Sequence, residues 1–536
     1  MPAIQSKLDP ASAAFQANRA RMLELVSRLR NLEDRTRRES EKAKPRFDKR
    51  GQILPRERIA RLLDAGAPWL ELSSMAGYCL DNPDPEKSIP GGGMIAGIGY
   101  VAGVCAMVVA SDSGIDAGAI QHMGREKLLR AQGLALENKL PFVHLVESAG
   151  ANLLKYRVEG FIHGGAIFYN LAKLSAAGLP VVTVVHGSST AGGAYMPGLS
   201  DYVIMVRGRA KAFLAGPPLL KAATGEIATD EELGGAVMHT HVSGLGEYLA
   251  EDDSDGVRLA RDVLSRLNIK TEQPGKSKPP RYAAEELLGV MPQNYKKSVD
   301  MREAIARFVD DSDFLDFKAD YGMATVCGHA AVQGHKVGII TNNGPLDPAG
   351  ATKATHFIQA CCQAGLPILY LQNTTGYLVG KASEEAGMIK HGSKMIQAVS
   401  NANVPQLTLM CGASFGAGNY GMCGRGYNPR FLFSWPNAQT AVMGAEQAAL
   451  TMAMVMEGGM KRKGQAVDEG KISELKKQIV ENFERQQSAF VTSALMLDDG
   501  IIDPRDTRNV LGFALSICKD GDARAVRPVQ FGVARP

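Results

Sequence analysis

Two short glycine-rich segments of this chain have a composition that suits the binding of a ligand oxygen by the backbone. Residues 187–195 read GSSTAGGAY and residues 412–420 read GASFGAGNY, an offset of 412 − 187 = 225 positions. Each follows an apolar run typical of a buried strand. Because small residues let a ligand approach the main chain, we expect two strand-to-helix turns with free N–H donors.

Backbone N–H groups at the start of a helix can stabilise an oxygen that gains negative charge during a reaction. The small residues of the two turns are Ala191, Gly192, Gly193, Gly416, Ala417 and Gly418. One such turn could simply permit close helix–strand packing, but two at matched positions favour a functional role. The sequence therefore predicts two oxyanion holes, which suits a reaction in which two carbonyl groups gain charge.

Familiar motifs near the turns do not define a site. G-x-S-x-G at 412–416 resembles a hydrolase nucleophile elbow, but that fold needs a His after the Ser, and the last His, His391, precedes Ser414. G-x-G-x-x-G at 416–421 lacks the acidic residue expected about 20 positions later in a dinucleotide site. The chain has no P-loop sequence.

Three ionisable residues near predicted strand ends are candidate general bases: Glu147, Asp112 and His186. Such side chains more often cap loops or helices. We find no catalytic triad and no metal-ligand cluster in the sequence, and expect no metal in this chain. A reaction driven by two oxyanion holes needs no protein nucleophile.

The turns require a repeated framework to position them. Each half predicts a strand pair joined by a Gly turn, a helix and a strand led by Leu-Pro, at 97–112, 124–138 and 140–150 and again at 328–343, 352–364 and 366–376. Short, β-branched strands that alternate with helices indicate covered parallel sheets. We therefore expect an α/β fold of two tandem domains related by internal duplication.

Composition indicates where the domains divide. A helical apolar period over residues 14–44 predicts an N-terminal helical arm at 1–45. The Lys- and Pro-rich segment 271–281 is the clearest linker. It separates an expected N-terminal domain, 46–275, from a C-terminal domain, 282–525, in which one long amphipathic helix is expected near the end, over residues 471–497.

The bulk properties exclude several classes of protein. With 45% hydrophobic and 22% charged residues and a net charge of +4, the chain gives no support to a nucleic-acid or membrane-surface role. No apolar run approaches the ~18–20 residues of a membrane span, and no signal-peptide core is present, so we expect a cytoplasmic protein. The eight cysteines form no C-x-x-C pair and are expected to be buried thiols.

Long stretches of the sequence resemble the carboxyltransferase (β) subunits of biotin-dependent acyl-CoA carboxylases, at 188–206, 213–226, 232–244, 414–438 and 442–449. The resemblance covers essentially the whole chain. It implies two crotonase-type ββα superhelix domains. It also implies an active site between the N-half of one subunit and the C-half of another.

The resemblance further implies roles for the two turns. The N-half turn would hold the acyl-CoA thioester oxygen with Gly192 and Gly193, beside Ala191, Ala194 and Tyr195. The C-half turn would hold the ureido oxygen of biotin with Gly416 and Ala417, beside Phe415, Gly418, Asn419 and Tyr420. N-carboxybiotin would release CO₂, the biotin enolate would take the substrate proton, and the carbanion would attack CO₂.

Biotin and ATP chemistry must belong to a partner, because the chain has no A-M-K-M biotinylation sequence and no ATP-grasp-like segment. The resemblance implies a biotin-carrying α subunit and an oligomer of β subunits, an α6β6 assembly, with no nucleic-acid or membrane partner. The lack of a C-x-x-C zinc ribbon argues against the β subunit of bacterial multisubunit acetyl-CoA carboxylase.

The acyl group is indicated by one segment. Methylcrotonyl enzymes usually have a segment resembling HFGRIFFN, whereas residues 163–170 read HGGAIFYN, with Gly164 in place of Phe and Ala166 in place of Arg. Loss of a benzyl group would open a space on the order of 100 Å³, and apolar burial is worth ~0.8 kcal/mol per CH₂. We therefore expect geranyl-CoA, in acyclic terpene breakdown; 3-methylcrotonyl-CoA, in leucine breakdown, is the alternative, in which Gly164 and Gly165 only loosen a helix start.

Other classes of protein stay open at this point. A crotonase-type hydratase or isomerase would need a carboxylate pair near one oxyanion hole and no second turn. A biotin-dependent decarboxylase subunit shares the fold and would be distinguished by membrane partners. A non-enzymatic scaffold has no need of two matched donor turns.

Overall fold

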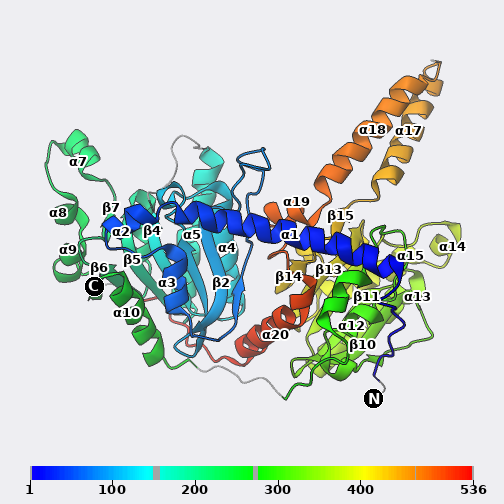
Figure 1. Ribbon diagram of the computed structural model, residues 1–536, viewed down its shortest axis with the longest axis horizontal. Helices are drawn as coiled ribbons and strands as arrows, with labels where there is room; N and C mark the ends of the chain where they lie inside the picture. The colour runs from blue at the N-terminus through cyan, green and yellow to red at the C-terminus, as the bar shows by residue number, and fades with distance from the viewer. Residues whose placement is uncertain (1–2, 149–156, 270–275, 465, 534–536) are drawn as a thin grey trace. The chain divides into compact units, whose positions relative to one another are not determined.

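The computed structural model describes residues 3–148, 157–269, 276–464 and 466–533 and contains two compact units (Figure 1). The first-half unit is formed by residues 31–273 with additions from 494–496 and 516–536. The second-half unit is formed by residues 1–30, 274–493 and 497–515. The expected arm, 1–45, is thus shared between the units, and the end of the expected C-terminal domain, from Ser516, groups with the first-half unit.

The first half of the chain supplies the α-helices α1 (Ala13–Glu41), α2 (Lys44–Lys49), α3 (Pro55–Leu62), α4 (His122–Glu137), α5 (Val158–Ala176), α6 (Tyr195–Gly198), α7 (Pro217–Thr224), α8 (Asp230–Gly234), α9 (Ala236–His241) and α10 (Asp253–Arg266). Its strands are β1 (Trp69–Glu71), β2 (Met94–Val101), β3 (Val104–Ser111), β4 (Phe142–Ser148), β5 (Val181–Thr190), β6 (Tyr202–Val206), β7 (Lys211–Phe213) and β8 (Tyr248–Ala250). A short 3₁₀ helix, η3 (Ala191–Ala194), follows β5.

The second half supplies the α-helices α11 (Leu287–Val290), α12 (Arg302–Ile305), α13 (Pro348–Ala364), α14 (Lys381–Glu385), α15 (Met388–Ser400), α16 (Gly418–Gly421), α17 (Ala445–Arg462), α18 (Glu469–Gln486), α19 (Ala489–Ala494) and α20 (Thr507–Ala523). Its strands are β9 (Leu315–Asp316), β10 (Thr325–Val332), β11 (His335–Asn342), β12 (Ile368–Thr374), β13 (Gln406–Phe415), β14 (Phe431–Ser434) and β15 (Gln439–Ala441).

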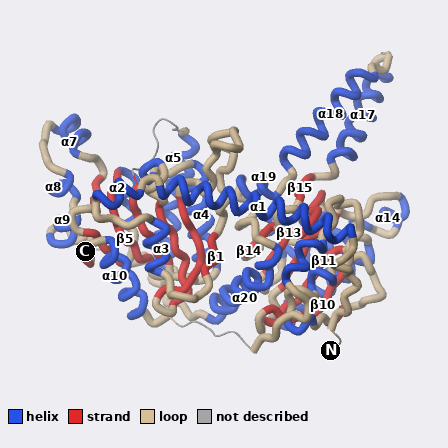
Figure 2. The backbone as a smooth tube through the Cα atoms, in the orientation of Figure 1, coloured by secondary structure: helices blue, strands red, loops and turns tan. Residues whose placement is uncertain are grey.

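The two sheets have the same strand order except for β8, which has no counterpart among the described strands of the second sheet, and this confirms the predicted duplication (Figure 2). In the first, β1, β2 and β3 are antiparallel neighbours, and β3, β4, β5, β6 and β8 follow in parallel. In the second, β9, β10 and β11 are antiparallel, and β11, β12, β13 and β14 are parallel. In both, a short extra strand, β7 or β15, pairs with the end of the strand that precedes a glycine turn.

Apolar strands buried on both faces explain this architecture. Every residue of β3, β4 and β13 is buried, as expected of sheets covered by helices on both sides. Six of the eight cysteines are buried and all eight are free thiols. Burial raises the pKa of Cys105 and Cys327 to about 12, so these two thiols stay protonated and unreactive.

The single helix expected over residues 471–497 is wrong. Helix α18 ends at Gln486 and α19 begins at Ala489. Between them the chain runs beside β15, where Gln487 O accepts from Thr440 N at 2.8 Å and Ser488 forms an antiparallel bridge with Gln439. Pairing with a strand therefore outweighs the amphipathic pattern.

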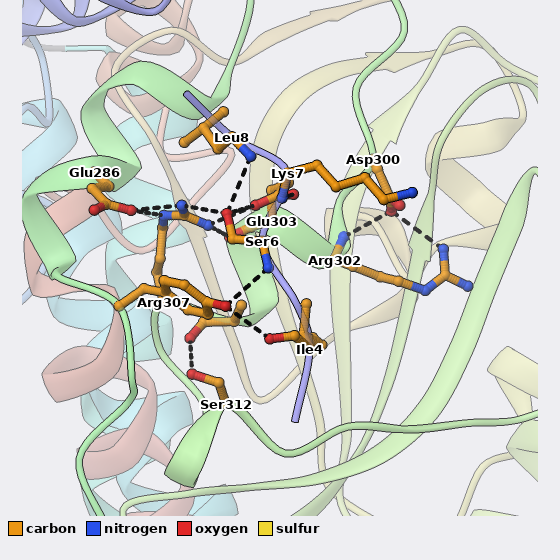
Figure 3. A network of polar contacts seen from close by, with 12 residues as sticks. Ile4, Ser6, Lys7, Leu8, Glu286, Asp300, Arg302, Glu303, Arg307 and Ser312 are labelled. Carbon is orange, nitrogen blue, oxygen red and sulfur yellow. Dashed lines mark hydrogen bonds and ion pairs between the residues drawn. The ribbon is translucent and has the colours of Figure 1, made fainter. Parts of the chain in front are cut away.

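A buried arginine anchors the N-terminal segment to the second-half unit (Figure 3). The guanidinium of Arg307 bonds Glu286 at 2.6 Å, Glu303 at 2.9 Å and Ser6 Oγ at 3.0 Å. Ser6 N in turn bonds the Tyr282 hydroxyl at 2.9 Å. The arm thus joins the body through a satisfied charge network as well as through apolar packing.

The expected linker, 271–281, lies partly outside the described residues; its described part, 276–281, has no helix or strand. Among the described residues no helix is long and apolar enough to cross a membrane. Within the same residues no three His, Cys, Asp or Glu side chains are grouped as metal ligands.

Stability of the fold should depend on the protonation of His144, a fully buried ring on β4 that packs edge-on against Phe142. Burial lowers its pKa to about 4, so the folded state holds it neutral while the unfolded chain protonates it below about pH 6.5. The stabilisation is therefore present above pH 6.5 and is lost as the pH falls towards 4. Between pH 7 and pH 5 we expect the free energy of unfolding to fall by about 2 kcal/mol more in wild type than in His144→Gln. Urea denaturation at both pH values measures the free energy of unfolding of each protein. An equal fall in wild type and His144→Gln between pH 7 and pH 5 would contradict the prediction.

Candidate functional site

The two glycine turns follow strands of equal length. Strands β5 and β13 each have ten residues, and the offset of 225 holds at both ends, 406 − 181 and 415 − 190. The first part of each strand pairs with one neighbour, β6 or β14. Its last three residues pair instead with β7 or β15. The predicted strand-to-helix turns are thus confirmed, and both leave the sheet from the same position.

The first turn begins with a left-handed residue. Ala191 has φ 53°, and the 3₁₀ helix η3 runs from Ala191 to Ala194 directly before α6. Gly192 is exposed and Gly193 is buried. Because an i→i+3 helix supplies no acceptor to its first residues, the N–H of Gly192 has no acceptor within η3.

The second turn begins with the same left-handed conformation, and its free N–H groups are shifted by one residue from our expectation. Gly416 has φ 54°, as Ala191 does, and 416 − 191 = 225. The N–H of Gly416 is bonded to Ala441 O at 2.9 Å, so it is not a free donor. Within the described part of the chain, no hydrogen bond is made by the N–H of Ala417 or Gly418. The structural equivalents of Gly192 and Gly193 are therefore Ala417 and Gly418.

Side chains at equivalent positions of the two turns are equally exposed. Tyr195 and Tyr420, at equivalent positions, are both 50% exposed. Each has an aromatic neighbour: Phe168 lies 6.0 Å from Tyr195 and Tyr427 lies 5.9 Å from Tyr420. Phe415 is buried against Tyr295, so it packs at the end of β13 and does not line the surface of the turn.

Beside the second turn, polar side chains hold the helix start. Asn419 Nδ2 donates to Ser414 Oγ at 2.7 Å, and Ser414 Oγ donates to Gln372 Oε1. Asn419 therefore has a structural role at the start of α16, and its expected contact with biotin stays a prediction.

Helix α5 connects Gly164 to the first turn. A Cβ placed on Gly192 would lie 3.7 Å from Phe168 Cζ, so Phe168 lies beside this exposed glycine. Gly164 lies one helical turn before Phe168 on the same face. A Cβ on Gly164 would meet only Arg125 Cδ, at 4.0 Å. Ala166 is about 200° around the helix from Gly164, so the structure does not bring it to this face.

An apolar cavity of about 400 Å³ borders the first turn. Its lining residues all belong to the first-half unit: Ala194, Ala212, Phe213, Leu214, Ala215, Leu220, Leu233, His239 and Leu245. Cavities of this size and character accept small organic ligands. Sequence reasoning found only Ala194 among these residues, because the others come from segments that fold beside β7.

The three candidate bases are held inside the protein. Asp112 is buried, accepts from Ser40 Oγ at 2.5 Å, and has a pKa that burial raises. Glu147 is paired with Arg58 at 2.7 Å. Their contacts fit a structural role, which is the more common one for such side chains.

His186 is also buried, and its Nδ1 bonds Asp253 Oδ1 at 2.9 Å. Burial, with the positive charge of Arg58, lowers the pKa of His186, so the ring is neutral. Burial opposes ionisation of Asp253, but the His186 and Arg58 contacts outweigh it and lower the pKa of that carboxyl. Arg58 and Asp253 gave no signal in the sequence, because they are far from the turns along the chain.

Strain at the first turn gives a test of its conformation. An alanine in the left-handed region costs roughly 1 kcal/mol relative to glycine. We expect Ala191→Gly to raise the free energy of unfolding by about that amount. Ala194→Gly, at φ −62°, should lower it by about 0.5–1 kcal/mol. Urea denaturation of both variants checks the pair, and the same sign for both would contradict the assigned turn.

The structure contains twice a sheet that begins with an antiparallel strand pair and continues in parallel, with a strand that leads through a glycine turn into a helix. The carboxyl transferase domain family matches residues 47–528. The chain belongs to this family, and the expected class, a carboxyltransferase β subunit of a biotin-dependent acyl-CoA carboxylase, is confirmed.

Individual relatives are similar over their full length. The probable methylcrotonoyl-CoA carboxylase beta chain of Drosophila melanogaster is 44% identical over 99% of this chain and 95% of its own. A probable biotin-dependent acyl-coenzyme A carboxylase beta2 subunit of Mycobacterium tuberculosis is 45% identical over 99% and 100%. The crystal structure of the beta subunit of geranyl-CoA carboxylase from P. aeruginosa is 52% identical, covers 99% of this chain and 100% of its own, and has a TM-score of 0.92. The predicted tandem crotonase-type fold is confirmed.

Proposed function

We propose that this chain transfers a carboxyl group from carboxybiotin, carried by a partner subunit, to geranyl-CoA. The observation that carries the proposal is the pair of equivalent turns with free N–H groups at Gly192 and at Ala417 and Gly418. Two carbonyl oxygens gain charge in such a transfer, and each requires preorganised donors. The domain at 46–275 is assigned the acyl-CoA and the domain at 282–525 the biotin.

At the first turn the chain's own groups act on the thioester. The N–H of Gly192, at the start of η3, donates to the thioester oxygen as the substrate carbon loses its proton. The helix start adds a partial positive charge. Phe168 and Tyr195 form an aromatic pair beside this oxygen.

The second turn fits a ureido oxygen. Bound carboxybiotin supplies the CO₂ and, after its release, a base for the substrate proton. The N–H groups of Ala417 and Gly418 face no acceptor among the described residues, so they are available to the ureido oxygen. Tyr420, half exposed beside them, offers an aromatic surface to the ring system.

The geranyl preference is supported by Gly164. On the face of α5 that leads to Phe168 and Gly192, position 164 has no side chain and a Cβ there would meet only Arg125 Cδ, at 4.0 Å, which favours a chain longer than five carbons. The 52% identity to the P. aeruginosa geranyl-CoA carboxylase subunit supports the same substrate. 3-Methylcrotonyl-CoA is the second candidate, supported by the name of the Drosophila relative.

The assembly is proposed by the same reasoning. A biotin-carrying α subunit must supply the second substrate, and an α6β6 complex would join the N-half of one β subunit to the C-half of another. Location in the cytoplasm stays a prediction.

Bicarbonate fixation by the complex with its co-expressed biotinylated partner tests the proposal. Geranyl-CoA, 3-methylcrotonyl-CoA and propionyl-CoA are compared in the same assay with ATP. We expect the highest kcat/KM for geranyl-CoA. A higher value for methylcrotonyl-CoA would make that thioester the substrate in place of geranyl-CoA. No carboxylation of any of the three would refute the proposed activity.

A further inference from the structure

A matched bulge precedes both glycine turns. In the first sheet the register runs from Val146↔Val185 to Ser148↔Ser189, so one residue, Glu147, faces three residues of β5. In the second sheet it runs from Gln372↔Met410 to Thr374↔Ser414, and Asn373 faces three residues of β13. Bulges of this kind re-aim the strand that carries them.

A polar side chain covers a glycine in each bulge. A Cβ on Gly187 would lie 2.6 Å from Glu147 Cγ, and a Cβ on Gly412 would lie 2.4 Å from Asn373 Oδ1. Neither glycine could carry a side chain without displacing its partner. Glu147 and Asn373 therefore occupy equivalent positions and fill the same space in the two units.

The chemistry of the two bulges differs. Glu147 accepts from Arg58 at 2.7 Å, from Ser113 Oγ at 2.8 Å and from Gln52 Nε2 at 3.3 Å. Its side chain is 10% exposed and that of Arg58 is 1% exposed. Asn373, by contrast, donates one long bond, of 3.5 Å, to Asn342 O. The first bulge is clamped by a buried ion pair and the second by a neutral amide.

The clamp extends to His186, the residue of β5 at the start of the bulge. Gln52 Nε2 also donates to His186 O at 2.8 Å, which fixes the residue before Gly187. Arg58 also pairs with Asp253 at 2.8 Å, the carboxyl that bonds the His186 ring. His186 is therefore held through its carbonyl by Gln52 and through its ring by Asp253 of α10.

After the bulge, the Ser189 side chain links β5 to the first turn. Ser189, the first residue after the bulge to regain a partner on β4, donates through Oγ to Gly193 O at 2.9 Å. The bulge thus sets where β5 resumes, and Ser189 ties that point to η3. An error in the bulge would move the N–H of Gly192.

We propose that Glu147, clamped by Arg58, is a positioning residue that fixes the β5 bulge and so aims the N–H of Gly192 at the acyl-CoA oxygen. This inference rests on the proposed function, in which the first turn binds that oxygen. The hydrogen bond from the Gly192 N–H matters most when the thioester oxygen carries charge. Misplacing this N–H therefore lowers kcat more than it raises KM.

The test compares Glu147→Gln with Asp520→Asn in the complete complex. Asp520 of α20 and Arg524, just after this helix, form another buried ion pair of the first-half unit, outside the bulge and the turn. Each variant removes one carboxylate partner from a buried arginine, which keeps its other contacts, and should lower the Tm. Only Glu147→Gln should lower kcat, by about tenfold or more, with the KM for acyl-CoA nearly unchanged.

A milder variant covers the case in which Glu147→Gln fails to fold. Ser113→Ala removes one hydrogen bond to Glu147 without unpairing a charge, and we expect a fall in kcat of about threefold. Wild-type kcat with Glu147→Gln, or an equal loss in Asp520→Asn, would overturn the positioning role. Failure of the wild-type complex to carboxylate any acyl-CoA would instead refute the proposed function itself.

Discussion

Gly164→Phe is expected to lower kcat/KM for geranyl-CoA by up to about a thousandfold and to leave 3-methylcrotonyl-CoA nearly unaffected. Geranyl-CoA has five more acyl carbons than the methylcrotonyl compound, and burial of each is worth ~0.8 kcal/mol, about 4 kcal/mol in all. A benzyl group on Gly164 would project along the face of α5 that carries Phe168, which contacts Gly192. The space for the additional carbons would be filled.

A matched control exists at the next position. A Cβ on Gly165 would meet nothing within 4 Å, and the next residue along a helix points about 100° away. Gly165→Phe should therefore leave the ratio of the two kcat/KM values unchanged. Competition assays with both thioesters in one mixture measure that ratio directly. An unchanged ratio in Gly164→Phe would exclude this face of α5 as the wall of the acyl site.

Ala417→Pro is expected to lower kcat by about 10²–10³ without loss of assembly. Ala417 has φ −68°, close to the value that proline imposes, and its predecessor is glycine. The substitution therefore removes one N–H donor with little cost to the backbone. Ala417→Gly keeps the donor and should retain most of the activity.

Size-exclusion chromatography tests whether the assembly is retained, and the rate of carboxyl transfer tests the expected fall in kcat. The equivalent position in the first turn is Gly192, so loss of either donor should act on the same reaction. A fully active Ala417→Pro enzyme would show that this N–H is not part of the site.

The duplicated framework could be predicted from the sequence because it depends on local patterns. Leu-Pro-led apolar runs marked β4 and β12, and the repeated spacing marked β5 and β13 at the same offset. The positions of the turns followed from their small residues. Helix α18 was extended too far because its apolar period continues past Gln486, while pairing of Ser488 with Gln439 depends on a residue 49 positions away, 488 − 439.

The chemistry of the turns was only partly predictable. Both turn segments look alike, but which N–H groups are free depends on Ala441, whose carbonyl binds the Gly416 N–H through pairing of β15 with β13. A left-handed alanine at Ala191 is likewise hidden, because the sequence alone would favour glycine there. The clamp on Glu147 requires Arg58 and Asp253, which only the tertiary fold brings together.

A crystal structure of the β-subunit assembly with geranyl-CoA and biotin bound would test the central claim most directly, because it locates both carbonyl oxygens. The account predicts the thioester oxygen about 2.7–3.1 Å from the N–H nitrogen of Gly192 and the ureido oxygen at a similar distance from those of Ala417 and Gly418. A thioester or ureido oxygen bound away from these turns would contradict it.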